Sequence, residues 1–498
     1  MLTNLRMRFR TLKSILKRPK ELLMNQDLRT YLVIDDSLVS ERHNVHLELG
    51  RVEKSNSNPL FVEEFFGDPP KRWEARYDNL YPNVIYDQNK GSFKLWYNAF
   101  IRAGQSEETP LDERPHNAYH GGKTEDGVMY ASSEDGLTWV KPDLGLIEFD
   151  GSTANNIVMT TGTHGAHGTG VLEDLLDPDA SRRFKALFKN PVSRQMEVAF
   201  SADGLQWSES VPWAEYSAVG DTHNNAIRDA TGRYVAVTRG WTGDEVDNGI
   251  RTAMRTESLD FVNWTDPEVI MQGRGLHDQI YSMPIFQIGP TYLGLPAIFH
   301  KGDPEADDWD TVDTELAWSQ DSIDWNRIAE GEPFIPRGEG KYPNGAYDCG
   351  CVYAAAPVLV GDTHYLYYGG SNGQHNNFRE GNLSLATIPR NRFAGYVAGG
   401  VDGQLTTTPL IWGVGGGTIN AIVGAGGVIR AAVIDEVGSE LEGFGFEDCE
   451  PIRQDSLESP LLWQQNTAQL AGRSLSLKFE FREATIYDFT GPFDLADH

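Results

Sequence analysis

Four aspartates stand at the start of strand-like, largely apolar runs of the sequence: Asp78, Asp221, Asp278 and Asp348. Carboxyl groups that converge from separate strands suit cleavage of a glycosidic bond, in which one acts as acid for the leaving oxygen and the other as base or nucleophile. We predict Asp78, Asp221 and Asp348 as catalytic residues, with Asp78 as base or nucleophile and Asp221 or Asp348 as acid. An aspartate before a strand is also an ordinary turn residue, which is the alternative for each.

Polar and aromatic side chains near these aspartates, or in loops expected to open beside them, are candidates for binding a substrate. Trp309, in the acidic loop GDPEADDWDTVD, is equally suited to stacking on a sugar ring and to packing its own loop. A lone histidine is more often a hydrogen-bonded structural residue than a ligand. The predicted substrate-binding residues are Asn79, His167, His223, Asn224, Arg239, Asp278, His300, Trp309 and His375.

No metal or cofactor site is predicted. The acidic loop would offer calcium the carboxylates of Asp303, Asp307, Asp308 and Asp310, but a solvated loop is the favoured interpretation. Only three cysteines are present, and their spacing fits neither a zinc site nor a disulfide framework. A reducing, cytoplasmic compartment is therefore expected.

A seven-residue string indicates how the chain positions these side chains. SEDGLTW at 133–139 places serine, aspartate and tryptophan at offsets that return three more times. Asp-Gly is a tight-turn signal, and the flanking runs are rich in aromatic and β-branched residues. Each copy is therefore expected to be the turn of a hairpin, with a structural role. The other copies are SADGLQW, SLDFVNW and SQDSIDW, which begin at Ser201, Ser258 and Ser319.

The string is part of a longer repeat. Reading outward from it gives five units of four strands between about residues 75 and 398, which predicts a five-bladed β-propeller. From about residue 400, alternating strands with glycine-rich turns and no such string predict a β-sandwich.

The resulting prediction is an all-β protein with three segments. A basic leader, helical in its spacing, covers 1–27, the five-bladed β-propeller covers 28–398, and the C-terminal β-sandwich covers 399–498. Within the propeller segment, residues 28–74 are expected to belong to the first blade or to close the ring.

The formal charge of −29 disfavours nucleic acid as a partner, since binding to phosphates needs lysine and arginine. Basic residues concentrate at 1–24, where apolar residues also recur at helical spacing. Contact of this segment with a membrane surface is one interpretation, and a loosely docked leader is the favoured one. The sequence has neither a transmembrane run of 18 apolar residues nor the apolar stretch of a secretory signal.

The repeat and the strand order together resemble the glycoside hydrolases of families 32, 43 and 68. The resemblance is carried by SEDGLTWVKPDLGLIEFDGSTANNIV, DTELAWSQDSIDW and YDCGCVYAAAPVLVGDTHYLYYGG, and it extends over most of 50–490. It implies a hydrolase with paired carboxylates in the propeller funnel and a carbohydrate substrate, furanosides among the candidates. The W-x-N-D-P, R-D-P and E-C signatures of family 32 are absent in register.

Two other functions stay open. The missing signatures favour a non-catalytic carbohydrate-binding propeller. A sialidase-like enzyme ranks last, because sialidases use six blades and an arginine triad, whereas the sequence gives five units and no clear triad.

Overall fold

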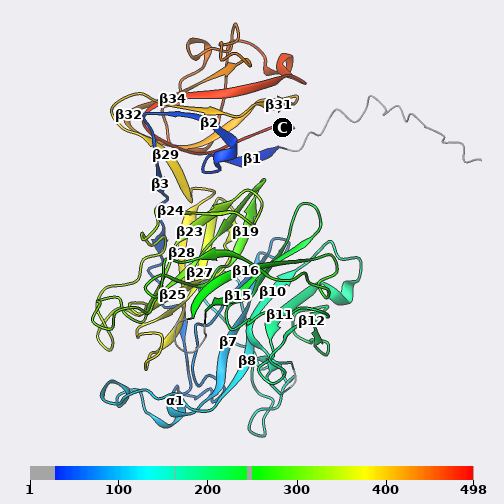
Figure 1. Ribbon diagram of the computed structural model, residues 1–498, viewed down its shortest axis with the longest axis vertical. Coiled ribbons are helices and arrows are strands. Elements are labelled where there is room, and N and C mark those ends of the chain that lie inside the picture. Colours follow the sequence, from blue (N-terminus) through cyan, green and yellow to red (C-terminus); the bar gives the residue numbers. More distant parts are fainter. Residues whose placement is uncertain (1–27, 163, 244–248, 497–498) are drawn as a thin grey trace, which may run out of the picture.

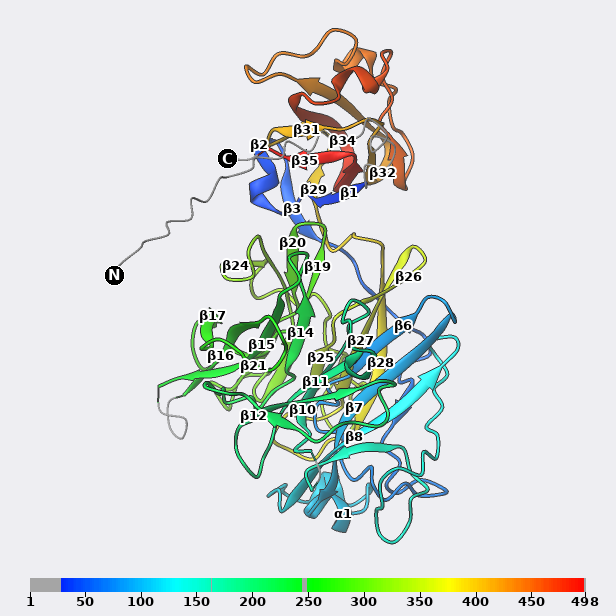
Figure 2. The same ribbon diagram turned by 90° about the vertical axis from the view of Figure 1, so that its right-hand side faces the viewer.

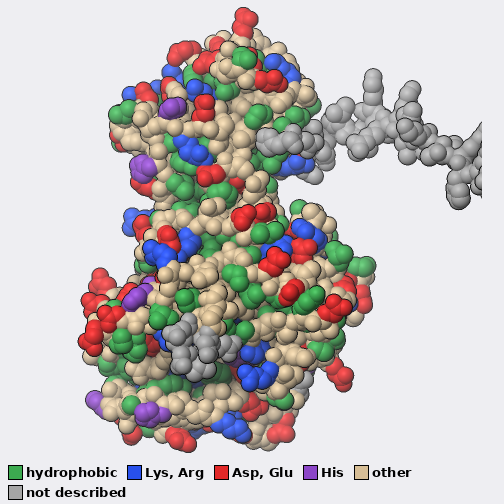
Figure 3. Space-filling model, viewed as in Figure 1, with side chains coloured by type: hydrophobic (Ala, Val, Ile, Leu, Met, Phe, Trp, Pro, Cys, Tyr) green, Lys and Arg blue, Asp and Glu red, His purple; other side chains and the backbone are tan. Residues whose placement is uncertain are grey.

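The computed structural model describes residues 28–162, 164–243 and 249–496. In these ranges the protein consists almost entirely of β-strands, and its one α-helix is the four-residue α1 (Gln105–Glu108). The predicted all-β class is confirmed. The strands gather in a larger lower part and a smaller upper part, which meet at a waist (Figures 1, 2 and 3). The predicted leader at 1–27, with its membrane-surface interpretation, lies outside the described residues.

Four antiparallel sheets of four strands each form a propeller-like arrangement in the lower part. The first sheet holds β6 (Asn83–Asp87), β7 (Ser92–Ala103), β8 (Thr124–Ser133) and β9 (Ile157–Thr160). The second holds β10 (His167–Glu173), β11 (Phe184–Lys189), β12 (Met196–Ser201) and β13 (Val211–Pro212). The third holds β14 (Asn225–Arg228), β15 (Tyr234–Thr242), β16 (Ile250–Ser258) and β17 (Glu268–Gln272). The fourth holds β19 (Ile285–Ile288), β20 (Thr291–Gly294), β23 (Leu316–Ser319) and β24 (Trp325–Ile328).

These sheets are buried on both faces, as strand β7 shows. Leu95 and Tyr97 pack into a core shared with Leu383 of a neighbouring sheet. Trp96 points the opposite way and packs against Phe184 of the second sheet. Successive side chains of a strand alternate between faces, so a nearly continuous apolar run fills the cores on both sides of the sheet.

A nine-stranded sheet joins the beginning of the described chain to its middle. Its main path is β18 (Gln279–Ser282), β21 (Ala297–His300), β22 (Thr311–Thr314), β25 (Cys351–Ala354), β27 (Thr363–Ser371), β28 (Gly381–Pro389) and β4 (Glu53–Lys54). Beside this path, β26 (Val358–Val360) pairs with β27, and β5 (Phe61–Val62) pairs with β28. The early strands β4 and β5 therefore pair with a strand more than 300 residues later.

The upper part is a ten-stranded sheet that combines both ends of the described chain. From the N-terminal side it takes β1 (Arg29–Leu32), β2 (Val39–His43) and β3 (His46–Leu49). Its later strands are β29 (Ala394–Ala398), β30 (Gly403–Thr407), β31 (Leu410–Trp412), β32 (Thr418–Ile434), β33 (Ser456–Pro460), β34 (Ser474–Gly491) and β35 (Phe493–Leu495). Residues 29–49 therefore pair with C-terminal strands and not with the propeller-like sheets.

The repeated string forms the turn between the third and fourth strands of each small sheet. In the first copy, the Ser133 hydroxyl accepts the Gly136 amide at 2.8 Å, and Asp135 accepts the amides of Leu137 and Thr138 at 2.8 and 2.7 Å. The other three copies repeat this pattern of hydrogen bonds. The predicted structural role of the string is confirmed, because serine and aspartate satisfy the backbone of a tight turn.

Candidate active site

His167 lies between two carboxylates that come from different sheets. It begins β10, and its Nδ1 is 2.7 Å from Oδ1 of Asp126 in β8, while its Nε2 is 2.7 Å from Oδ1 of Asp221, just before β14. Gly168 permits this approach: its φ is +61°, and a Cβ there would lie 1.7 Å from the carbonyl oxygen of Thr222. Three sheets thus converge on one carboxylate–imidazole–carboxylate network.

The network holds a proton on its histidine. Burial acts to lower the pKa of His167, but the charge and hydrogen bond of Asp126, together with the bond to Asp221, raise it well above 6.5. Burial likewise acts to raise the pKa of Asp221, yet His167 and the Arg239 guanidinium hold it far below its usual range. Asp221 is the open member, with 47% of its side chain exposed, against 16% for His167. The arrangement is an imidazolium between two carboxylates, reachable from the Asp221 side.

Asp78 borders the same network. A small hollow is lined by Asp78, Tyr81, Asp126 and His167, so the first-sheet aspartate shares space with the network. Arg379 Nη2 donates to Asp78 Oδ1 at 2.7 Å, and the Asp78 side chain is 21% exposed. The predicted residues Asp78, His167 and Asp221 are therefore brought together from places far apart in the sequence.

Arg239 is the fourth predicted residue found here. The sequence placed it in a loop, but it lies within β15, where Nη1 donates to Asp221 Oδ2 at 3.3 Å and Nη2 donates to the carbonyl of Tyr281 at 2.8 Å. Its guanidinium also lies over the Tyr281 ring, 4.1 Å from the centroid. Arg239 thereby holds Asp221 in place beside Tyr281.

Several other predicted residues lie buried behind the network and do not face the solvent-exposed side of Asp221. Asn79 is buried and accepts from Arg379 at 2.9 Å. His223 is buried against Tyr81, and burial lowers its pKa to about 3, so it is neutral. Asn224 is fully buried and donates to backbone carbonyls. These side chains satisfy buried polar groups.

His375 is another predicted residue that lies buried behind the network, beside Tyr281. Its Nδ1 is 2.8 Å from the Tyr353 hydroxyl, and its ring packs edge-on against Tyr281. Burial and four nearby arginine charges hold the pKa of His375 well below 6.5, so the imidazole is neutral. It can offer or accept a hydrogen bond but carries no charge.

The other predicted residues lie outside the network. Asp348 is 1% exposed and is held by Lys54 Nζ at 2.5 Å and the Tyr368 hydroxyl at 2.8 Å. Trp309 is half-buried, and its carbonyl accepts from Gln374 at 3.1 Å, which fits loop packing. The structure does not bring Asp348 or Trp309 to His167.

Asp278 and His300 line a separate pocket in the nine-stranded sheet region. Asp278 pairs with Arg327 at 3.0 Å and with Arg274 at 2.7 Å. His300 Nε2 is 2.9 Å from Asp313. Both side chains are therefore occupied by ion-pair partners of the protein itself. Their contacts give no support to the prediction that they bind the same substrate as Asp78.

Sequence reasoning missed Asp126, Arg251, Arg379 and Tyr281. Asp126, Arg251 and Tyr281 lie within strands, and Arg379 stands in a polar stretch just before β28, which is the one signal that could have marked it. Within the described residues, no group of three or more His, Cys, Asp or Glu side chains has an arrangement suited to a metal ion. In the acidic loop, Asp307 pairs instead with Lys341 at 2.9 Å.

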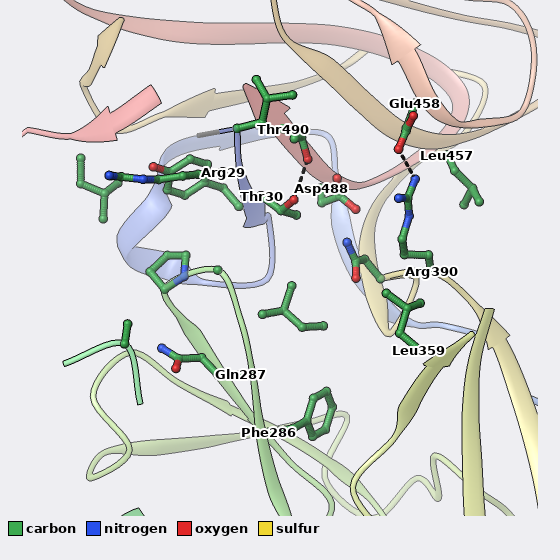
Figure 4. Close-up of a pocket in the computed structure, with 18 of the residues that line it drawn as sticks. Arg29, Thr30, Phe286, Gln287, Leu359, Arg390, Leu457, Glu458, Asp488 and Thr490 are labelled. Atoms are coloured by element: carbon green, nitrogen blue, oxygen red, sulfur yellow. Dashed lines mark hydrogen bonds and ion pairs between the residues drawn. The ribbon is translucent and has the colours of Figure 1, made fainter. Parts of the chain in front are cut away.

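A larger cleft lies elsewhere, at the waist between the ten-stranded sheet and the lower part. Figure 4 shows its walls, in which Thr30 and Thr490 face each other at 2.8 Å and Phe286 closes the lower side. Asp488 lies in the upper wall, where burial raises its pKa to about 6. His364 also lines this cleft, but its Nε2 contacts the Asn391 side chain at 3.2 Å, and among the described residues of the lining no histidine forms an ion pair with an aspartate as His167 does.

No protein-family model and no curated protein matches the sequence. Solved structures with similar folds include an N-acetylgalactosamine deacetylase from F. plautii in complex with blood group B trisaccharide, at 12% identity and a TM-score of 0.42, covering 70% of this chain and 97% of that one. A β-1,2-mannobiose phosphorylase from Listeria innocua gives 14% identity and a TM-score of 0.44, covering 68% and 97%. A glycosyl hydrolase from Bacteroides ovatus gives 15% and 0.41, covering 68% and 94%. Such values support no statement about function, and the resemblance to families 32, 43 and 68 stays a prediction.

Among the described residues, no helix has the length and apolar character that crossing a membrane demands.

Proposed function

We propose that this protein is a carbohydrate-active enzyme that cleaves a glycosidic bond at the network of Asp78, Asp126, His167 and Asp221. The supporting observation is the protonated His167 held between two carboxylates beside a third, Asp78, which pairs with Arg379 at 2.7 Å. Glycosidic cleavage needs one proton donor and one charged carboxylate on opposite sides of the sugar.

In this proposal the His167–Asp221 pair supplies the proton to the leaving oxygen, and Asp78 acts as base or nucleophile. Asp126 keeps the imidazole charged and oriented, and Arg239 holds Asp221. The pair titrates as a unit, so the proton can leave through the exposed Asp221 carboxylate while residing on His167 at rest. Asp348, enclosed by Lys54 and Tyr368, is left out of the site.

The proposal is tested by measuring product release from a panel of oligosaccharides and aryl glycosides, resolved by chromatography. Release by wild type and its loss in Asp78→Asn are expected, with Asp112→Asn, an exposed aspartate outside the site, as the matched control. Release that survives Asp78→Asn would remove Asp78 from the mechanism. Absence of release from every substrate, combined with sugars that raise the melting temperature, would favour the non-catalytic carbohydrate-binding propeller instead.

We also propose the five-bladed division of the lower part and a sandwich for the upper part. The nine-stranded sheet is linked between β22 and β25 by a single parallel pair, Val312 with Cys351. Dividing it there leaves β25, β27, β28 and β4 as a fifth blade and assigns β18, β21 and β22 to the fourth. The ten-stranded sheet encloses its own core around Trp412 and Phe479, as two packed layers would. An experimental structure in which the sheet runs continuously across Val312 would contradict the division.

A further inference from the structure

Four arginine side chains gather around the proposed site. Arg239 and Arg251 lie in neighbouring strands of the third sheet, and both guanidinium groups lie over the Tyr281 ring, 4.1 and 5.5 Å from its centroid. Arg76 and Arg379 both approach Asp78, from the segments that precede β6 and β28 respectively, and Arg379 is 1% exposed. We call Arg76, Arg239, Arg251 and Arg379 the arginine cluster.

Only two members of the cluster have a close carboxylate partner among the described residues. Arg379 Nη2 pairs with Asp78 Oδ1 at 2.7 Å, and Arg239 Nη1 pairs with Asp221 Oδ2 at 3.3 Å. In each pair, one guanidinium of the cluster meets one carboxylate of the proposed site.

Arg76 and Arg251 lack such a partner within those ranges. Arg76 Nε is 3.8 Å from an Asp78 oxygen that Arg379 already occupies, and its Nη2 donates only to the carbonyl of Asn377. Arg251 Nη1 donates to the neutral Gln279 side chain at 3.0 Å. Arg76 Nη1, Arg251 Nε and Arg379 Nε are buried without a hydrogen-bond partner in the described part of the chain.

The site therefore carries more positive than negative charge. Four guanidinium groups and the His167 imidazolium face three carboxylates, those of Asp78, Asp126 and Asp221. One positive charge remains when the buried Asp310 is counted as well. Glu63, whose charge also acts on Arg76, lies 3.9 Å from a further arginine, Arg114, which balances it. Uncompensated buried charge is costly, and its presence in a protein of net charge −29 calls for a reason.

The charges are crowded enough to oppose one another. Burial, followed by the repulsion from Arg239, lowers the pKa of Arg251 to about 10. Burial and the neighbouring Arg379 lower the pKa of Arg76. An added anion would relieve both effects, because opposite charge favours the protonated guanidinium.

We propose that Arg76, Arg251 and Arg379 bind an oxyanion next to Asp221, supplied either as the acidic group of a sugar substrate or as a free phosphate-like anion. The fork of an arginine donates two parallel N–H bonds to a carboxylate or phosphate, which a lysine cannot do. Arg251 is partly exposed and lies near enough to Asp221, which is 47% exposed, for the two charges to interact, so solvent reaches both residues. This inference rests on the proposed function, because it names the substrate class of the same site.

The test uses the full chain and measures melting temperature and calorimetric affinity. The probes are galacturonate and glucuronate, the matched neutral sugars galactose and glucose, and inorganic phosphate. We expect an acidic probe to bind and to raise the melting temperature, with weaker binding at high salt. Arg251→Met, which keeps the apolar stem, should weaken that binding by roughly tenfold or more, and Arg251→Lys should fall between. Arg453→Met, at an exposed arginine of the upper part, is the matched control.

The outcomes separate the two sources and the two proposals. Binding by uronates but not phosphate assigns the anion to the substrate, and binding by phosphate alone assigns it to a free ion. If no acidic probe binds better than its neutral counterpart, or if Arg251→Met binds them as well as wild type does, the inference is overturned, even where neutral glycosides are still cleaved. Binding without cleavage of any glycoside would overturn the proposed function and leave the anion site standing.

Discussion

His167 and Asp221 form an ion pair at 2.7 Å although they belong to different sheets and lie 54 residues apart. Asp126 contacts the other ring nitrogen of His167 at the same distance. The two carboxylates together favour the protonated imidazole, so the pair carries the proton of the proposed site. Asp221 is the only one of the three that is widely exposed, so it is the group that a substrate would meet first.

Substituting Asp221→Asn should lower kcat/KM by roughly 100-fold or more, since a neutral amide cannot pass on the proton of His167. Steady-state kinetics on the best substrate of the panel checks this, and the melting temperature shows that the fold is kept. Asp266→Asn, an exposed aspartate near the third sheet, should behave as wild type. A variant with unchanged kcat/KM would exclude Asp221 from the chemistry.

Substituting Asp126→Asn should lower the pKa of His167, because it removes the negative charge that most favours the imidazolium. The proposed acid is the protonated form, so activity is lost as the pH rises through this pKa. The alkaline limb of the pH–rate profile should therefore move to lower pH in the variant, in step with the His167 resonance in an NMR titration. A limb that stays in place would show that His167 is not the titrating group.

Stability should fall as the pH rises from about 4.5 to about 7, because of Glu63. This buried side chain accepts the amides of Tyr77 and Gly381, and burial raises its pKa to about 7. The folded state thus binds a proton that the unfolded state releases, and about 3 kcal/mol is lost across this window. Urea denaturation at several pH values should show this slope in wild type and a flatter one in Glu63→Gln, whatever its overall stability. Glu41→Gln, at an exposed position, should retain the wild-type slope.

Removing the serine of one repeated turn should destabilise the fold. In Ser258→Ala the buried Phe261 amide loses its acceptor, now 3.0 Å away, at a cost of about 1–3 kcal/mol in the free energy of unfolding. Ser439→Ala, on an exposed serine of the upper part, should cost far less. Equal unfolding energies for the two variants would mean that the turn does not depend on the hydroxyl.

Local structure could be predicted from short stretches of the chain. The alternation of apolar residues marked the strands, and the serine–aspartate string marked turns whose hydrogen bonds are made within seven residues. Such features depend on backbone geometry and side-chain chemistry close along the chain, so they can be predicted without tertiary contacts. Asp78, His167 and Asp221 were candidates from the sequence because each stands near the start of a strand, whereas Arg239 was a candidate from an expected loop that is part of β15.

Which of these residues lie together depends on packing between distant parts of the chain. Asp221 and Asp348 occupy equivalent places in the sequence pattern, yet one is half exposed against His167 and the other is enclosed by Lys54, a residue nearly 300 positions away. Asp126, Arg251 and Arg379 likewise reach the proposed site only through packing between sheets, and they were not candidates from the sequence. The pairing of residues 29–49 with the C-terminal strands likewise depends on the burial of a shared core. Long-range packing sets the protonation and exposure of each charged group, and that information is absent from any short stretch of the chain.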